Sequence, residues 1–133
     1  MNKKYERYIN YIVNDIEPPY FINMEEMYGL KPEEYKLILD KVFNQPIRIN
    51  GNDVYDQNGN LIYHEDSTGY WTKKEYDNQG NLIYREDSDG SWVRYKYDRN
   101  GNKIYYEDSN GHWLKQEFDD LGNLIYRKIN GYW

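Results

Sequence analysis

A repeat of 21 residues constrains the fold of this chain more than any other feature. The segment 55–63 reads Tyr-Asp-Gln-Asn-Gly-Asn-Leu-Ile-Tyr, and near copies of it begin at Tyr76, Tyr97 and Phe118. A second motif, Glu-Asp-Ser-x-Gly-x-Trp, recurs with the same period from Glu65, Glu86 and Glu107. Self-similarity at a fixed spacing is the signature of a repeat architecture, in which each unit packs against its neighbours.

Each unit contains two turn signals and two strand signals. In the turns, Asp can bond its own backbone two residues further on, and Gly adopts positive φ where the chain reverses. The segments between the turns, such as Trp92–Tyr97, are short and rich in β-branched and aromatic residues, as strands are. Strands joined by tight turns run antiparallel. Residues 47–133 therefore predict an elongated antiparallel β-meander of hairpin repeats, with units starting at Tyr55, Tyr76, Tyr97 and Phe118.

Residues 1–46 carry a helical pattern and form the other predicted domain. Apolar residues recur at three- and four-residue spacing over 5–16, which predicts a helix that Pro18-Pro19 ends. Asn23 is a predicted N-cap with Glu26 as its capping-box partner, and Pro32 begins a further helix. The predicted fold class is α+β, with a small N-terminal helical head before the repeat sheet. The head has no basic face for DNA, so we expect it to pack against the sheet.

The register of the hairpins decides which side chains share a face. If the Asp-Ser-x-Gly turn closes a regular hairpin, Ile83 and Trp92 share one face with Arg85 and Arg94. The other face then holds Leu82, Tyr84, Val93 and Tyr95. A slip of one residue would exchange the faces. In either case equivalent residues form rows along the sheet, and the shortened last unit, with Lys128 in place of the repeated Glu, predicts a capping end.

Composition excludes several classes of protein. The 133 residues include no cysteine, so a disulfide scaffold is excluded, and the net charge of −6 argues against a basic nucleic-acid binder. The mean hydropathy of −1.14 is typical of disorder, but 17 tyrosines are not. No apolar stretch approaches a membrane span, and the first residues do not resemble a signal peptide. We therefore expect a cytoplasmic protein.

No residue pattern predicts catalysis, a cofactor or a metal site, and we expect a protein that is not an enzyme. His64 and His112 occupy different positions of the repeat, and the serines Ser67, Ser88 and Ser109 recur in turns without a base. The segment 87–90 is similar to the start of a calcium loop, but no bidentate Glu follows at the required position. Turn formation explains these residues.

Charge and aromatic residues are the more informative signal. Residues 51–133 hold 15 acidic and 10 basic side chains, so most of the negative charge lies in the sheet. The acids could imitate a phosphate backbone, or they could cap turns and keep an exposed sheet soluble. Exposed Trp and Tyr are the residue types of interaction hot spots. The predicted partner-binding residues are Trp71, Trp92, Trp113, Tyr84, Tyr105, Glu65, Asp66, Glu86, Asp87, Glu107 and Asp108.

The Tyr-Asp-x-x-Gly-Asn-Leu motif over residues 55–126 resembles the YD repeats of Rhs-type proteins, with Phe118 replacing Tyr once. That resemblance implies β-hairpin arrays, which in the family form shells around toxin cargo, although four units cannot enclose anything. The longer unit is also similar to repeats that follow a helical head in short proteins of bacteriophages and mobile elements. Choline-binding repeats of cell-wall proteins are less similar, because their Gly-Trp and Trp-Tyr-Tyr runs are missing here.

These observations lead to a non-enzymatic, protein-binding repeat module. The resemblance implies a phage or mobile-element accessory protein in the cytoplasm of a bacterial host. Its partner would be a host defence protein, such as a nucleic-acid-binding effector or nuclease, inhibited in an anti-CRISPR-like manner by steric block or acidic mimicry. The alternatives are a carbohydrate- or cell-wall-binding module that uses stacked aromatic rings, and a structural protein that dimerises through its sheet edges. The sequence does not decide the partner, the oligomeric state, or whether head or sheet makes the contact.

Overall fold

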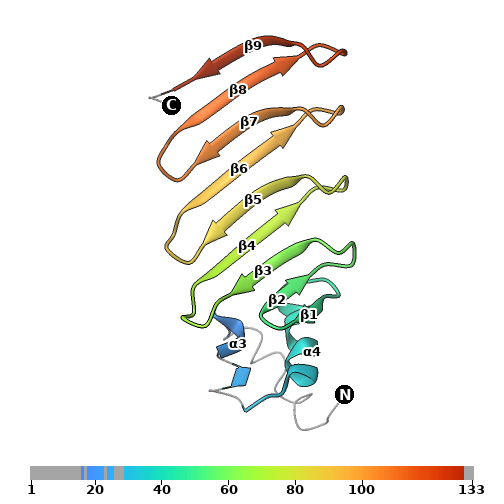
Figure 1. The fold of residues 1–133 in the computed structure, drawn as a ribbon, viewed down its shortest axis with the longest axis vertical. Coiled ribbons are helices and arrows are strands. Elements are labelled where there is room, and N and C mark those ends of the chain that lie inside the picture. Colours follow the sequence, from blue (N-terminus) through green and yellow to red (C-terminus); the bar gives the residue numbers. More distant parts are fainter. Residues whose placement is uncertain (1–15, 17, 23, 26–28, 131–133) are drawn as a thin grey trace. The chain divides into compact units, whose positions relative to one another are not determined.

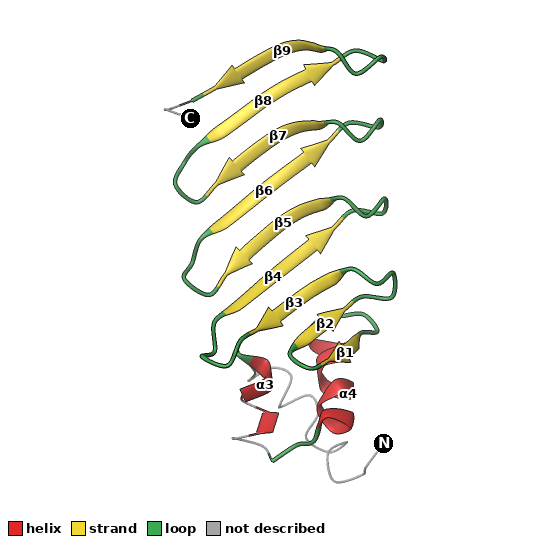
Figure 2. Cartoon of the chain, viewed as in Figure 1, coloured by secondary structure: helices red, strands yellow, loops and turns green. Residues whose placement is uncertain are grey.

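A computed structural model describes residues 16, 18–22, 24–25 and 29–130, and the fold within them is α+β (Figures 1 and 2). Within these residues the α-helices are α3 (Tyr20–Ile22) and α4 (Pro32–Val42), and they precede nine strands. The strands are β1 (Arg48–Asn50), β2 (Asp53–Tyr55), β3 (Leu61–Glu65), β4 (Trp71–Tyr76), β5 (Leu82–Asp87), β6 (Trp92–Tyr97), β7 (Lys103–Asp108), β8 (Trp113–Phe118) and β9 (Leu124–Ile129). They follow chain order in an open antiparallel meander, which confirms the predicted fold class.

The helix α4 begins where the sequence predicts it. Pro32 stands in its first turn, and the Glu34 carboxylate accepts the backbone N–H of Lys31 at 3.2 Å. Its buried side chains are Tyr35, Ile38 and Leu39, which lie on one side of the helix. The predicted helix over 5–16 and the N-cap Asn23 with its partner Glu26 lie outside the described residues.

The chain divides into two compact units, unit 1 (residues 1–71) and unit 2 (residues 72–133). Unit 1 contains a conventional core, in which helix and strand side chains are buried together. Its buried apolar residues are Tyr20, Phe21, Met24, Leu30, Tyr35, Ile38, Leu39, Ile47, Val54, Ile62 and Tyr63. In the described part of unit 2, residues 72–130, no side chain is buried. The repeats of unit 2 are therefore held by strand pairing and side-chain contacts on two accessible faces.

The two turn motifs of the repeat fold in the same way. In the turn after β5, the backbone N–H of Asp87 donates to the Ser91 carbonyl at 2.9 Å, and Gly90 has a φ of 90°. The same pair of bonds, from Asp to the residue four positions on and from Gly back to Asp, closes the turns at Asp56, Asp66, Asp77, Asp98, Asp108 and Asp119. Each turn is thus a three-residue loop with Gly in its last position.

This loop length makes the predicted faces wrong at Tyr84 and Arg85. Tyr84 lies opposite Arg94, Glu86 lies opposite Trp92, and Arg85 lies opposite Val93. Directly opposed residues share a face, so Tyr84 and Arg85 exchange the places that a regular hairpin would give them. A second irregularity follows every Gly-Asn turn. In β4 and β5, Glu75 opposes Tyr84 and Tyr76 opposes Leu82, which leaves one extra residue as a β-bulge.

The last strand, β9, is exposed at every position. Leu124, Ile125 and Ile129 are apolar side chains with exposed fractions of 48%, 63% and 42%. A capping end would carry a polar outer surface, and β9 differs from that expectation. One edge of unit 2 therefore presents apolar side chains.

Candidate protein-binding face

Cross-strand pairing in unit 2 gathers aromatic and charged side chains on one face. Glu86 lies opposite Trp92, Arg94 opposite both Tyr84 and Glu107, and Lys96 opposite Tyr105. In the next pair, Trp113 lies opposite Glu107 and Lys115 opposite Tyr105. Side chains alternate along each strand, so these residues share one side of the sheet. We call this set the aromatic face; it consists of Tyr84, Glu86, Trp92, Arg94, Lys96, Tyr105, Glu107, Trp113 and Lys115.

Cations lie over the rings of this face. The Arg94 guanidinium carbon is 5.2 Å from the centre of the Trp92 ring and 5.8 Å from that of Tyr84. The Lys96 and Lys115 ammonium groups lie 5.2 Å and 5.3 Å from the rings of Tyr105 and Trp113. Distances below about 6 Å allow cation–π attraction. The basic side chains therefore hold the rings in place without burying them.

Paired tyrosines and glutamates form the second element of the face. The Tyr84 hydroxyl donates to Glu86 Oε1 at 2.9 Å, and the Tyr105 hydroxyl donates to Glu107 Oε2 at 2.5 Å. Partial burial, followed by the bond to Glu86, raises the pKa of Tyr84, and the bond to Glu107 raises the pKa of Tyr105. Both tyrosines remain protonated donors at neutral pH, and each fixes one carboxylate oxygen of its glutamate.

A groove crosses this face. It is lined mainly by Tyr84, Arg94, Lys96 and the isoleucines Ile83 and Ile104. The groove combines apolar walls with a guanidinium group, an ammonium group and the carboxylates of Glu75 and Asp77, a mixed composition suited to a protein segment.

The aspartates of the Gly-Asn turns accept hydrogen bonds from backbone N–H groups. In the turn after β6, Asp98 Oδ1 accepts the backbone N–H groups of Asn100 and Asn102, both at 2.9 Å. The Asn102 side-chain amide donates to the other carboxylate oxygen at 3.1 Å, which explains the recurrent Asn after Gly. Asp56, Asp77 and Asp119 make the same three bonds with the residues equivalent to Asn100 and Asn102. In the four Gly-Asn turns the acids have a structural task.

The predicted acidic residues at the other turns also have partners. Asp66 Oδ1 accepts bonds from Thr68 and from the backbone N–H of Tyr70. Asp87 accepts bonds from Thr72 and Arg85, and Asp108 accepts one from the Tyr106 hydroxyl at 2.7 Å. Asp108 lies opposite Val93, and Asp87 opposite Thr72, so both are on the side of the sheet away from the aromatic face.

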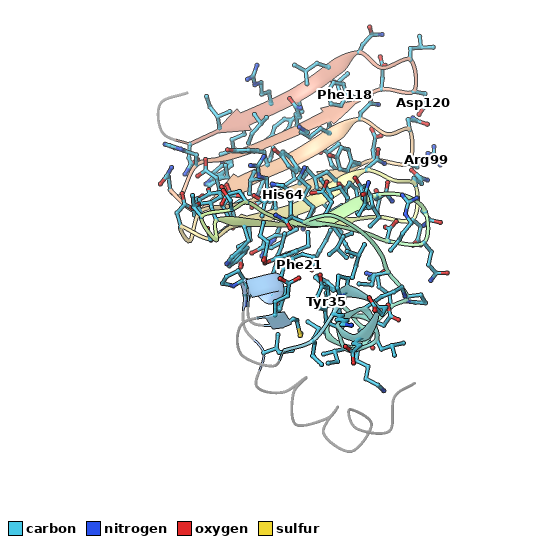
Figure 3. All side chains as sticks on the ribbon, turned by 60° about the horizontal axis from the view of Figure 1, so that its bottom comes forward. Phe21, Tyr35, His64, Arg99, Phe118 and Asp120 are labelled. Atoms are coloured by element: carbon cyan, nitrogen blue, oxygen red, sulfur yellow. The ribbon has the colours of Figure 1, made fainter. Side chains whose placement is uncertain are left out.

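Two further predicted residues, Glu65 and Trp71, belong to unit 1. Glu65 is 1% exposed, and its carboxylate accepts the Tyr63 hydroxyl at 2.6 Å and the backbone N–H of Phe21 at 3.0 Å. The Trp71 ring is stacked on the Tyr63 ring, with centres 6.3 Å apart. Figure 3 shows Phe21 beside the strands and near Tyr35, whose ring it meets edge-on at 5.6 Å. Burial excludes Glu65 from contact with a partner.

Sequence reasoning missed the basic members of the face. Arg94 and Lys115 stand two residues after Trp92 and Trp113, and Lys73 holds the equivalent position after Trp71. A cation repeated at 21-residue spacing beside each Trp is the signal that could have identified them.

Within the described residues, no group of three or more His, Asp or Glu side chains could hold a metal ion. His64 is paired with Asp53, and His112 Nδ1 lies 3.4 Å from Asp108. Ser109 Oγ accepts the backbone N–H of Trp92 at 3.1 Å, a structural contact between a turn and the preceding repeat.

Among the described residues, no helix is long and apolar enough to cross a membrane.

No protein-family model matches this chain, and no curated protein matches it either. Among solved structures, it is similar to one described as the crystal structure of TcdB2-TccC3-TEV, with a TM-score of 0.38 and 17% sequence identity. The match covers 60% of this chain and 6% of that chain, so this chain spans a small part of that protein. The hairpin repeats of unit 2 are compatible with the resemblance to YD repeats.

Proposed function

We propose that this chain is a non-enzymatic repeat module that binds another protein through the aromatic face of unit 2. The observation that carries the proposal is the gathering of Trp92, Trp113, Tyr84, Tyr105 and Arg94 on one accessible face. Trp, Tyr and Arg are the residues most enriched in interaction hot spots. Their cation–π contacts hold the rings in position before binding, which reduces the entropy lost when a partner is ordered against them.

The proposal also includes the kind of partner. We propose a host defence protein as the target, because the repeat unit resembles short proteins of bacteriophages and mobile elements. The aspartates of the turns hold backbone N–H groups, and both glutamates of the aromatic face lie opposite basic residues, Glu86 opposite Lys73 and Glu107 opposite Arg94. These features favour inhibition by steric block over acidic mimicry of nucleic acid.

A capture experiment with matched variants tests this function. Wild-type protein, a Trp92→Ala/Trp113→Ala variant and an opposite-face Arg85→Ala/Gln116→Ala variant are each used to capture proteins from bacterial lysate at low and high salt. We expect one protein to be retained by the wild type and the opposite-face variant and lost by the aromatic variant. Equal capture by all three folded proteins would contradict the proposal. Loss of the captured protein at high salt from every sample would favour mimicry.

A second candidate function, self-assembly, is favoured by one observation, the exposed apolar strand β9. Such an edge can pair with a strand of a second copy. Analytical ultracentrifugation tests this with Ile125→Lys in β9 and, as its control, Leu121→Lys in the adjoining turn, where the side chain is 88% exposed. Concentration-dependent dimerisation that only Ile125→Lys abolishes would establish self-assembly, and a monomer at all concentrations would exclude it.

A further inference from the structure

In unit 1, the helical head occupies the first Tyr–Glu pair of the repeat array. Glu65 binds the Tyr63 hydroxyl with one oxygen and the backbone N–H of Phe21 with the other. The Tyr63 ring lies 5.0 Å from the Tyr20 ring and 6.1 Å from the Phe21 ring, measured between ring centres. Trp71 stacks on the same tyrosine. The array thus holds two adjacent aromatic residues by one charge-assisted hydrogen bond and a platform of rings.

The next repeat carries the same residue types 21 residues further on, with Arg94 lying over the Tyr84 and Trp92 rings where the first repeat stacks Trp71 on Tyr63. Tyr84, Glu86 and Trp92 replace Tyr63, Glu65 and Trp71, and the Tyr–Glu hydrogen bond is retained at 2.9 Å. Here the residues are half-buried, whereas Tyr63 and Glu65 are 0% and 1% exposed. Tyr84 fixes Glu86 Oε1, and no hydrogen bond from a described residue reaches Glu86 Oε2, the oxygen position that could accept a backbone N–H.

We propose that the Tyr84–Glu86 site binds a segment of a partner protein that contains two adjacent aromatic residues, as the first repeat holds Tyr20 and Phe21. This inference rests on the proposed function and specifies its ligand. The backbone N–H of the second aromatic residue would donate to the Glu86 carboxylate. The two rings would pack against Tyr84, with Trp92 in the place of Trp71 and with Arg94 supplying a cation to the aromatic surface.

The chain's own head is an unsuitable occupant of the second site. Phe21 and Tyr20 are 6% and 5% exposed in unit 1, and they pack there against Tyr35, Phe43 and Tyr63. Leaving that site would expose both rings and remove the Phe21 hydrogen bond from the buried Glu65 carboxylate. A segment from a different protein has no such cost, so the open repeat favours a partner over the head of a second copy.

The test uses the full chain and a peptide with the sequence of residues 18–25, which contains the Tyr-Phe pair. The control is the same peptide with alanine at both aromatic positions. Chemical shifts of backbone amides are followed by NMR during titration. We expect the aromatic peptide to shift the amides of residues 84–86 and 92–94, and the alanine peptide to leave them unchanged. Shifts confined to residues 63–65, or equal effects of both peptides, would overturn the inference.

Two variants place the contact on Glu86. Glu86→Gln should weaken peptide binding about ten-fold, because a charge-assisted hydrogen bond becomes a neutral one. Tyr84→Phe removes the hydroxyl that orients the carboxylate and should weaken binding less. Asp120→Asn removes the same charge from a turn residue whose side chain is 90% exposed and should leave binding unchanged. Circular dichroism confirms that each variant is folded, and unchanged binding by folded Glu86→Gln would overturn the inference.

The outcomes separate this inference from the proposed function. If the peptide fails to bind while protein capture still depends on Trp92 and Trp113, the aromatic-pair ligand is wrong and the protein-binding function stands. If the peptide binds at Glu86 but the Trp92→Ala/Trp113→Ala variant captures the same protein as the wild type, the proposed function fails. Self-association that is lost when Tyr20 and Phe21 are replaced by alanine would identify a second copy as the occupant and overturn the partner assignment.

Discussion

Three residue types determine each Gly-Asn turn of this protein. Asp98 accepts two backbone N–H groups, Gly101 supplies a φ of 86°, and Asn102 binds the second carboxylate oxygen. These are local interactions, so the turns could be predicted from the sequence of each repeat alone. The chain needs this local definition because residues 72–130, the described part of unit 2, contain no buried core to position the loops.

Replacing Gly101 by alanine tests the backbone requirement. No atom lies within 4 Å of the added methyl group, so the cost arises from the positive φ alone. We expect Gly101→Ala to lower the free energy of unfolding by about 1–2 kcal/mol. Arg99→Ala, at a side chain that is 86% exposed in the same turn, should change it by less than about 0.5 kcal/mol. Urea denaturation of both variants measures the difference, and equal effects would contradict this account.

Acid should weaken the same turns. Hydrogen bonds from the backbone of the following Asn hold the pKa of Asp77, Asp98 and Asp119 below the usual value. Because the folded-state pKa is depressed, the carboxylates contribute stability above the unfolded-state pKa of about 3.9 and lose it as the pH falls through the folded-state pKa. The urea midpoint should therefore be steady near neutral pH and fall below about pH 4. Asp98→Asn should reduce that fall, and an acid dependence identical to that of the wild type would contradict the assignment.

At the scale of the elements, the two strands of each repeat and their antiparallel order could be predicted, but the faces of Tyr84 and Arg85 could not. A hairpin closed by a two-residue loop and one closed by a three-residue loop pair different residues across the two strands, so they place different side chains on each face. The Asp-Ser-x-Gly sequence is compatible with both loops. The sequence therefore identifies the Trp, Tyr and Glu members of the aromatic face as candidate contacts, but not the register that brings them together. The sequence places Arg94 on the face of Trp92, but the predicted partner-binding residues include none of the basic side chains of that face.

The position of Glu65 was also beyond the reach of the sequence. Glu65, Glu86 and Glu107 occupy equivalent positions, and each accepts a tyrosine hydroxyl. Only docking of the head distinguishes the first of them, because α3 brings the Phe21 N–H to its second oxygen. Long-range packing between unlike elements leaves no periodic trace in the repeat.

Replacement by glutamine should therefore have different effects on stability at positions 65 and 107. We expect Glu65→Gln to lower the free energy of unfolding by about 1–3 kcal/mol, because it disturbs buried hydrogen bonds to Tyr63 and Phe21. Glu107→Gln, at a half-buried site, should cost less than about 1 kcal/mol. Urea denaturation gives both values. Faster hydrogen exchange of the Phe21 amide in the first variant alone would confirm the cause, and matching stabilities would contradict it.

On the scale of the whole molecule, the two units of the chain are stabilised in different ways. Unit 1 buries apolar side chains from α3, α4 and the first strands, whereas the described part of unit 2 relies on ladders of half-exposed residues. Local opening is easiest where few apolar side chains are buried. The head could be predicted from its helical pattern, but the division after Trp71 falls inside the repeat array, whose sequence is periodic across it.

Hydrogen–deuterium exchange should reveal this difference. We expect the slowest exchange in α4 and around Val54 and Tyr63, and the fastest strand exchange in β9, where every residue is exposed. Ile125→Lys leaves the core of unit 1 untouched and should leave its protection unchanged. Uniform protection from β3 to β9 would contradict the assignment of the core to unit 1.

The central claim is that the aromatic face of unit 2 meets a protein partner, and site-specific photo-cross-linking in bacterial cells tests it most directly. A benzophenone-bearing residue replaces either Arg94 on the aromatic face or Arg85 on the opposite face, two exposed arginines of neighbouring strands. We predict a discrete adduct with another protein from position 94 and none from position 85. Adducts from position 85 alone, or from both positions equally, would contradict the account.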